Sequence, residues 1–397
     1  MTAAVATLTA LIAAAGIFQA IAGWLAVRRF AGLAPPPRGA RPPMTVLKPL
    51  YGDEPLLEEA LASLCAVDYP DLQIVFGVQS QGDAALAVVA RLRARFPDRD
   101  IAVVVDPAVH GSNHKIGNLI NMFPSAKHDI LVIADSDVHC TPDYLDAVAA
   151  TLAIPGTGLA TTLYAGRVAR PGLVSALGAV WINASFLPGA VMARSLGRQD
   201  CLGATMALRR ETLTAIGGLR ALVDHLADDH ELGKLVQRLG LAVRLAPTLV
   251  ATTVPETGFA TLYRHEIRWS RTILSLVPFG FAMSAIQYPL FWAALAIGLS
   301  GGAMWTLLLF ALAWIARAGA AWGIDARLGL ARSGLAAPAP FWLFPLRDVL
   351  SMVVFLASYR SDDVEWRGQH LTTGRHAAFA DPQPVPHSRA SAPQGSM

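Results

Sequence analysis

The sequence predicts an α/β domain with a largely parallel sheet, joined to membrane helices at both ends of the chain. Two observations predict this fold class. Between residues 43 and 255, short apolar runs alternate with helical patterns, which is typical of strands covered by helices on both faces. Outside these limits lie long apolar segments, and only 15% of the 397 residues are charged, against about a quarter in average soluble domains.

The first 29 residues are predicted to form a retained membrane anchor. Residues 3–27 are nearly all apolar, about long enough to cross the hydrocarbon core of a bilayer. Four arginines follow, at Arg28, Arg29, Arg38 and Arg41, whereas a signal peptide carries its positive charges before the apolar stretch. Because positively charged flanks stay in the cytoplasm, we expect the next domain to face the cytoplasm.

The α/β domain is expected over residues 43–255. Its first four strands are predicted at 44–50, 72–78, 101–105 and 130–134. Helical patterns separate them, and no internal repeat is evident. In such sheets ligands bind beyond the C-terminal ends of the strands, so the polar residues that follow each strand are the candidate site.

Two carboxylates, Asp135 and Asp137, directly follow the fourth strand. On alternate residues at a strand end, they are predicted to share a divalent cation, because Mg²⁺ or Mn²⁺ prefers oxygen ligands and often binds one or two carboxylates plus substrate phosphates. Such an ion would stabilise a diphosphate leaving group as a Lewis acid. An ordinary surface turn is the alternative for so short a motif.

The pair Asp228 and Asp229 precedes a helical pattern. Acidic residues at a helix start are stabilised by the helix dipole and by capping, which is the simpler interpretation. The functional interpretation makes Asp229 a general base that removes a proton from an attacking hydroxyl. The presence of the other motifs in the same chain favours the functional interpretation.

An interfacial helix is expected over residues 256–275. It carries His265, Arg268 and Trp269 at positions i, i+3 and i+4, so all three share one helix face. Arginine pairs with phosphate through its planar fork, and the indole ring could line an acceptor opening. In isolation, Trp and Arg before a membrane segment are ordinary belt residues.

Three further residues are candidate contacts of a nucleotide donor. Lys115 lies in a polar loop that enters a helix, where backbone amides and the ammonium could hold phosphate. Lys48 ends the first strand and could approach a base, and Asp83 follows the second as a candidate uridine contact.

The C-terminal membrane region is expected over residues 276–359. Apolar runs at 276–299 and 302–315, joined by a short hinge, indicate a helical hairpin. A third run, 341–359, contains Arg347 and Asp348 and is either a third crossing or a tilted, re-entrant helix. The apolar segment 173–196 is expected to lie on the membrane surface or in the core. The tail, 360–397, is predicted to be mostly disordered after about residue 376.

Composition excludes other classes of protein. A net charge of +3 without a Lys/Arg tract gives little support to nucleic-acid binding. The three cysteines are scattered without metal-ligand spacing and suit a reducing cytoplasm.

In their order along the chain, these motifs resemble membrane-bound glycosyltransferases of the family 2/21 type with a GT-A fold, a Rossmann-like mixed sheet. The chain looks like the ceramide glucosyltransferase branch, and closer still like the hopanoid-biosynthesis glycosyltransferases. The matching strings are Lys48–Leu50, Asn113–Asn118, Asp135–Asp137, Asp200–Thr212, Leu226–Asp229, His265–Trp269 and Val364–Gly368.

The resemblance implies an inverting, metal-dependent transfer from UDP-GlcNAc or UDP-glucose to a membrane lipid, with bacteriohopanetetrol as the expected acceptor. It implies a multi-pass protein of the bacterial inner membrane whose catalytic domain faces the cytoplasm. Ceramide and diacylglycerol remain alternative acceptors. Two departures from the family pattern are His265, where Gln or Arg is usual, and Asp83, which lacks acidic neighbours.

Two rival functions remain at this stage. A processive polysaccharide synthase shares these motifs but usually has more membrane helices, which build an export channel. A catalytically inactive sensor or scaffold that binds a UDP-sugar would suit the two departures from the family pattern. The retention of Asp135, Asp137 and Asp229 argues against the sensor, because a sensor needs no base.

Overall fold

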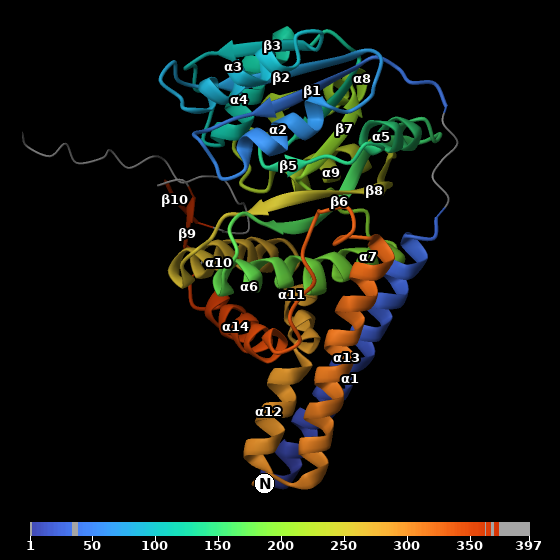
Figure 1. The fold of residues 1–397 in the computed structure, drawn as a ribbon, viewed down its shortest axis with the longest axis vertical. Helices are drawn as coiled ribbons and strands as arrows, with labels where there is room; N and C mark the ends of the chain where they lie inside the picture. The colour runs from blue at the N-terminus through green and yellow to red at the C-terminus, as the bar shows by residue number, and fades with distance from the viewer. Residues whose placement is uncertain (1, 34–38, 362, 367–368, 373–397) are drawn as a thin grey trace, which may run out of the picture.

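The computed structural model describes residues 2–33, 39–361, 363–366 and 369–372. An α/β domain stands on a layer of transverse helices, and a bundle of apolar helices extends away from that layer (Figure 1). The described chain thus has three tiers, and the middle tier connects the other two.

A single mixed sheet forms the centre of the α/β domain. Its eight strands lie in the order β3-β2-β1-β4-β7-β6-β8-β5. Strands β1 to β4 pair in parallel, while β7 runs antiparallel to both β4 and β6. The strands are β1 Met44–Pro49, β2 Leu72–Val78, β3 Asp100–Val105, β4 Ile130–Ala134, β5 Val138–His139, β6 Thr157–Val168, β7 Thr205–Arg209 and β8 Ala242–Val254. The predicted α/β fold with a mixed sheet is confirmed.

Helices cover both faces of the sheet and create two apolar cores. Because side chains alternate along a strand, Val46 of β1 packs into one core and its neighbour Leu47 into the other. The first core includes residues of α2, α3 and α5, and the second includes residues of α4, α8 and α9. These helices are α2 Leu57–Cys65, α3 Ala85–Arg95, α4 His114–Met122, α5 Tyr144–Leu152, α8 Arg210–Ala215 and α9 Asp228–Arg238.

The transverse layer consists of α6 Leu173–Trp181, a π-helical turn η2 Ile182–Phe186, α7 Leu187–Ser195, α10 Phe259–Leu276 and α14 Leu343–Ser358. Segment 173–195 is long and apolar enough to span a membrane, yet 56% of its most apolar window is buried inside the protein. It lies under β6 and β8, across the direction of α1 and α13 (Figure 1). The segment was expected to lie either on the membrane surface or in the core. More than half of its most apolar window is buried, as the second expectation requires.

The apolar bundle contains α1 Thr2–Phe30, α12 Pro289–Leu299 and α13 Met304–Leu328. Within the described residues, α1, segment 173–195 and α13 are long and apolar enough to cross a membrane. The predicted continuous helix at 276–299 is instead broken into α11 Pro278–Met283, a 3₁₀ turn, and α12, with a bend of 65°. Pro289 is the first residue of α12. Because proline has no backbone N–H and its ring clashes with the preceding turn, it interrupts a helix that would otherwise run through this position.

Helix α14 has 16 residues, about 24 Å at 1.5 Å per residue, which is shorter than a bilayer core of roughly 30 Å. It lies crosswise beside α10 and α6 (Figure 1). Between the two predictions for residues 341–359, this geometry favours the tilted helix. A hairpin of β9 Asp363–Trp366 and β10 Gln369–Thr372 follows; Arg367, Gly368 and the tail expected to be disordered lie outside the described residues.

Candidate active site

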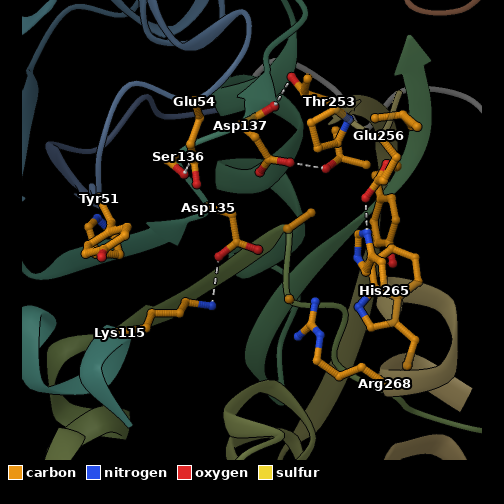
Figure 2. Close-up of a pocket in the computed structure, with 18 of the residues that line it drawn as sticks. Tyr51, Glu54, Lys115, Asp135, Ser136, Asp137, Thr253, Glu256, His265 and Arg268 are labelled. Carbon is orange, nitrogen blue, oxygen red and sulfur yellow. Dashed lines mark hydrogen bonds and ion pairs between the residues drawn. The ribbon is translucent and has the colours of Figure 1, made fainter. Parts of the chain in front are cut away.

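A cavity of about 550 Å³ lies between the C-terminal strand ends and the transverse helices. The loop after β4, the start of α9 and one face of α10 all line it. Figure 2 shows Asp135 and Asp137 of the loop after β4 facing the same space as His265 and Arg268 of α10. Most of the predicted site residues lie here: Lys115, Asp135, Asp137, Asp229, His265, Arg268 and Trp269.

The loop after β4 presents two carboxylates to the cavity. Asp135 has a side-chain exposure of 37%, and Asp137 accepts a short hydrogen bond from the Thr252 hydroxyl. Burial, and then the nearby charge of Asp135, raise the pKa of Asp137 to about 6. Between them, Ser136 donates to Glu54 at 2.5 Å, which connects this loop to the loop after β1.

Lys115 lies at the centre of the acidic groups. Its ammonium is 2.8 Å from Asp135 Oδ1 and 3.3 Å from Asp228 Oδ2. Burial alone would lower the pKa of Lys115, but the two carboxylates outweigh it and raise the pKa above its usual value. The side chain reaches this place from the first turn of α4, whose start is capped by Asn113 at 3.1 Å from the Ile116 amide.

Asp229 begins α9 and faces the same cavity. Its Oδ1 accepts a hydrogen bond of 2.7 Å from the His230 amide. Burial, and then the adjacent Asp228, raise the pKa of Asp229 to about 7, while Lys115 opposes the shift. Gly203 leaves room for the carboxylate, since a Cβ at that position would be 3.1 Å from Asp229 Oδ2. A carboxylate with a pKa near neutrality suits a general base.

The charges around the cavity are unbalanced. Its lining includes the carboxylates Glu54, Asp135, Asp137, Asp228, Asp229, Glu256 and Glu266 against the cations Lys115 and Arg268. Of these carboxylates, Glu266 is already paired with a buried arginine of α14, Arg347, and the others still outnumber the two cations. A diphosphate would add further negative charge to this space. The oxygen donors of Asp135 and Asp137 suit Mg²⁺ or Mn²⁺, so the residues present fit a divalent cation bound together with a phosphorylated substrate.

One face of α10 forms the wall opposite the carboxylates. His265 and Trp269 pack edge to face with ring centroids 4.3 Å apart, and Trp269 lies 5.3 Å from the Trp181 ring of α6. Arg268 extends into the cavity (Figure 2). His265 Nδ1 makes a short hydrogen bond to the buried carboxylate of Glu256. This contact fixes the ring orientation of the residue that departs from the family pattern.

Two predicted nucleotide contacts are placed elsewhere. The Lys48 side chain is fully buried, and its ammonium donates to the carbonyls of Asp135, at 2.7 Å, and Val138, at 3.3 Å. Lys48 therefore stabilises the backbone of the loop that carries Asp135 and Asp137. The sequence had predicted instead that it would approach the base of a nucleotide. Asp83 Oδ1 accepts from the amides of Gly52 and Ala85, both at 2.9 Å, so it joins the loop after β1 to the start of α3 and does not line the cavity.

Several residues of the cavity were not singled out from the sequence. Glu54 follows Asp53 in one loop and Glu256 is a single carboxylate in another, and nothing in their local sequence marks either as a cavity residue. Tyr164 of β6 and Trp181 of α6 line the cavity beside Trp269. Trp181 lies within the apolar segment 173–196, where its sequence neighbours do not distinguish it from a packed or membrane-facing residue.

Residues 7–378 match the sequence model of the family described as Glycosyl transferase family 21. Ceramide glucosyltransferase 1 of Caenorhabditis elegans is 21% identical over 246 residues, which cover 62% of this chain and 53% of that one. Ceramide glucosyltransferase of Komagataella phaffii is 32% identical over 99 residues, 24% of this chain and 19% of that one. The chain spans about half the length, or less, of these curated relatives.

One solved structure shares the fold over nearly the whole chain. The mannosyltransferase PcManGT from Pyrobaculum calidifontis superposes with a TM-score of 0.50 at 19% identity, covering 91% of this chain and 99% of its own. At that identity the likeness concerns the fold, and it agrees with the predicted GT-A-like sheet. Since the family match covers almost all of the folded chain, the protein belongs to glycosyl transferase family 21.

Proposed function

We propose that this protein is an inverting lipid glycosyltransferase that moves a sugar from a UDP-sugar to a hydroxyl of a membrane lipid. The observation that carries the proposal is the cavity itself. It joins a carboxylate of pKa about 7, Asp229, to a carboxylate pair suited to a divalent cation, at the level where the α/β domain meets the apolar helices. The proposed base, the proposed leaving-group site and the layer proposed to face the lipid would thus share one space.

The reaction would be a single displacement. The acceptor hydroxyl attacks the anomeric carbon as its proton passes to Asp229, and the bond from that carbon to the diphosphate oxygen breaks with its electron pair leaving on UDP. Attack from the face opposite the leaving group inverts the anomeric centre. Arg268 would offset the negative charge that develops on UDP, because a guanidinium binds phosphate through two donors.

A divalent cation bound by Asp135 and Asp137 would supply Lewis-acid stabilisation of the diphosphate. The ammonium of Lys115 pairs with the carboxylates of Asp135 and Asp228 and so offsets the repulsion between them. Lys48 donates to the Asp135 carbonyl and so stabilises the backbone of the carboxylate loop. The related fold of PcManGT was solved with GDP-Man and Mn²⁺, which supports a nucleotide-sugar donor with a metal ion here. UDP, and glucose or N-acetylglucosamine as the sugar, follow from the resemblance described above.

The acceptor we propose is a hopanoid polyol, bacteriohopanetetrol, and the protein would lie in the bacterial inner membrane with the α/β domain in the cytoplasm. The similarity to ceramide glucosyltransferases supports ceramide as a second candidate. The aromatic wall of Trp181 and Trp269 would line the acceptor side of the cavity, next to the transverse helices.

Purified protein in detergent should be incubated with radiolabelled UDP-GlcNAc or UDP-glucose, Mn²⁺, and each acceptor in turn, and the lipids analysed by mass spectrometry. One hexose or N-acetylhexosamine per acceptor, in β linkage by NMR, is the expected product. Chains of many sugars would support a processive synthase, and tight UDP binding without transfer to any lipid would support a sensor.

A further inference from the structure

A buried ion pair joins helix α10 to helix α14. Glu266 lies on α10 between His265 and Arg268, and both of its carboxylate oxygens accept bonds of 2.7 Å from the guanidinium of Arg347 on α14. The side chain of Arg347 is 0% exposed and that of Glu266 is 5% exposed. A bidentate pair of this kind fixes direction as well as distance.

The same guanidinium also fixes α6. Arg347 Nη1 donates to the Leu177 carbonyl at 3.2 Å, one turn before Trp181. Its Nε donates to Ser351 Oγ at 3.0 Å, which sets the side chain's course along α14. One side chain therefore joins the two helices that carry Trp181 and Trp269, the rings that pack together in the cavity wall.

The next residue of α14 points to the opposite side. Asp348 accepts from Arg317 of α13 at 3.3 Å and from the Leu290 amide of α12 at 3.1 Å. Arg317 in turn donates to Ser185 Oγ of η2 at 2.7 Å. Helix α14 thus has one buried charge toward the cavity helices and another toward the apolar bundle, and the second pair does not contact α10.

A buried ion pair contributes little to stability, because the desolvation of both charges offsets their attraction, and apolar residues of similar volume often replace such a pair without loss. Packing between α10 and α14 is already supplied by Ile267, Val354 and Ala357. Apolar contacts are not directional, whereas the two hydrogen bonds between Arg347 and Glu266 can fix the rotation of α10 about its own axis. The ion pair therefore has a positional use that its energetics do not explain.

We propose that Glu266 and Arg347 are positioning residues for the transfer reaction, which hold the His265, Arg268 and Trp269 face of α10 in its reactive orientation. This inference rests on the proposed function. A rotation of α10 would move Arg268 away from the departing diphosphate and Trp269 away from Trp181, while Asp135 and Asp137, on a different element, would keep their places.

The decisive variant is the double substitution Glu266→Leu with Arg347→Met, which removes both charges and keeps similar volumes. Its matched control is Asp348→Leu with Arg317→Met, which removes the second ion pair of the same helix. We expect the first variant to keep the wild-type melting temperature and to lose about 10- to 100-fold in kcat, the effect of a small misplacement of catalytic groups. The control should keep kcat within about threefold.

Hydrogen exchange supplies a readout besides activity. The first variant should exchange faster in 259–276 and 173–181, and as slowly as wild type in the sheet. Wild-type kcat together with wild-type exchange in the first variant would overturn the proposal, as would an equal loss of kcat in the control. If wild-type protein transfers no sugar to any lipid, the proposed function fails, whereas the exchange data still decide whether the pair orients α10.

Discussion

Replacing Asp229 by Asn gives the sharpest test of the catalytic assignment. An amide has nearly the shape of the carboxylate and cannot take up the proton of the acceptor hydroxyl. A positioned general base typically contributes about 10²- to 10⁴-fold, so the barrier should rise by roughly 3 to 5 kcal/mol. UDP affinity should stay near the wild-type value, since the diphosphate contacts are assigned to other residues.

The pH dependence follows from the raised pKa of Asp229, about 7. The base acts as the ionised carboxylate, so kcat/KM of the wild type should rise tenfold per pH unit below pH 7 and level off above it. The Asn variant should lack this limb. Steady-state rates from pH 5.5 to 8.5 with a soluble short-chain acceptor measure both.

Stability should change in the opposite direction from activity. Because the folded-state pKa lies above the usual Asp value of 3.8, the protonated group favours folding at low pH, and this contribution is lost as pH rises through 7. Relative to wild type, the stability of the Asn variant should therefore increase as pH rises from about 4 to 7 and stay at that higher level above pH 7. A shift of about three pKa units sets an upper bound of about 4 kcal/mol. Near-wild-type turnover by a variant that binds UDP normally would remove Asp229 as the base.

Three further predictions concern the same cavity. Gly203→Ala should lower kcat about tenfold or more with UDP binding retained, because the new Cβ would meet Asp229 Oδ2 at 3.1 Å; equal rates for variant and wild type would contradict this. Lys115→Met should weaken UDP binding about tenfold in calorimetry, because Asp135 and Asp228 would then face the diphosphate without their nearest cation; unchanged affinity would show that the ammonium stabilises the folded protein only and does not assist UDP binding. EDTA should abolish transfer, and Mn²⁺ or Mg²⁺ should restore it; full activity after exhaustive chelation would exclude the metal assignment.

The early strands were predictable because they are buried on both faces. Residues 72–78 and 130–134 form strands with the predicted bounds, and such runs of apolar residues depend little on distant contacts. The carboxylates after β4 were predictable for the related reason that a strand end determines where the next residues point. Local pattern was enough for these elements.

Other features depend on contacts between distant residues, which no local pattern records. The break in the apolar stretch before Pro289 is stabilised where Asp348 accepts from the Leu290 amide, 58 residues away. Likewise, Arg347 and Asp348 read as an expensive charge pair inside an apolar run, and only the fold reveals that each has a separate partner on another helix. Hydropathy reports only the local composition of the chain, whereas the break before Pro289 and the pairing of Arg347 and Asp348 depend on contacts between helices that are distant in sequence.

The residues at 48 and 265 make contacts that their place in the motifs did not predict. Lys48 follows the expected string, yet its ammonium is buried behind the carboxylate loop, bonded to the Asp135 carbonyl. His265 departs from the usual Gln or Arg, and a buried carboxylate, Glu256, has a place beside it. A Gln at 265 would leave the Glu256 carboxylate buried without the imidazole that now binds it. The substitution at 265 is therefore better understood as half of a pair than as a loss of the motif.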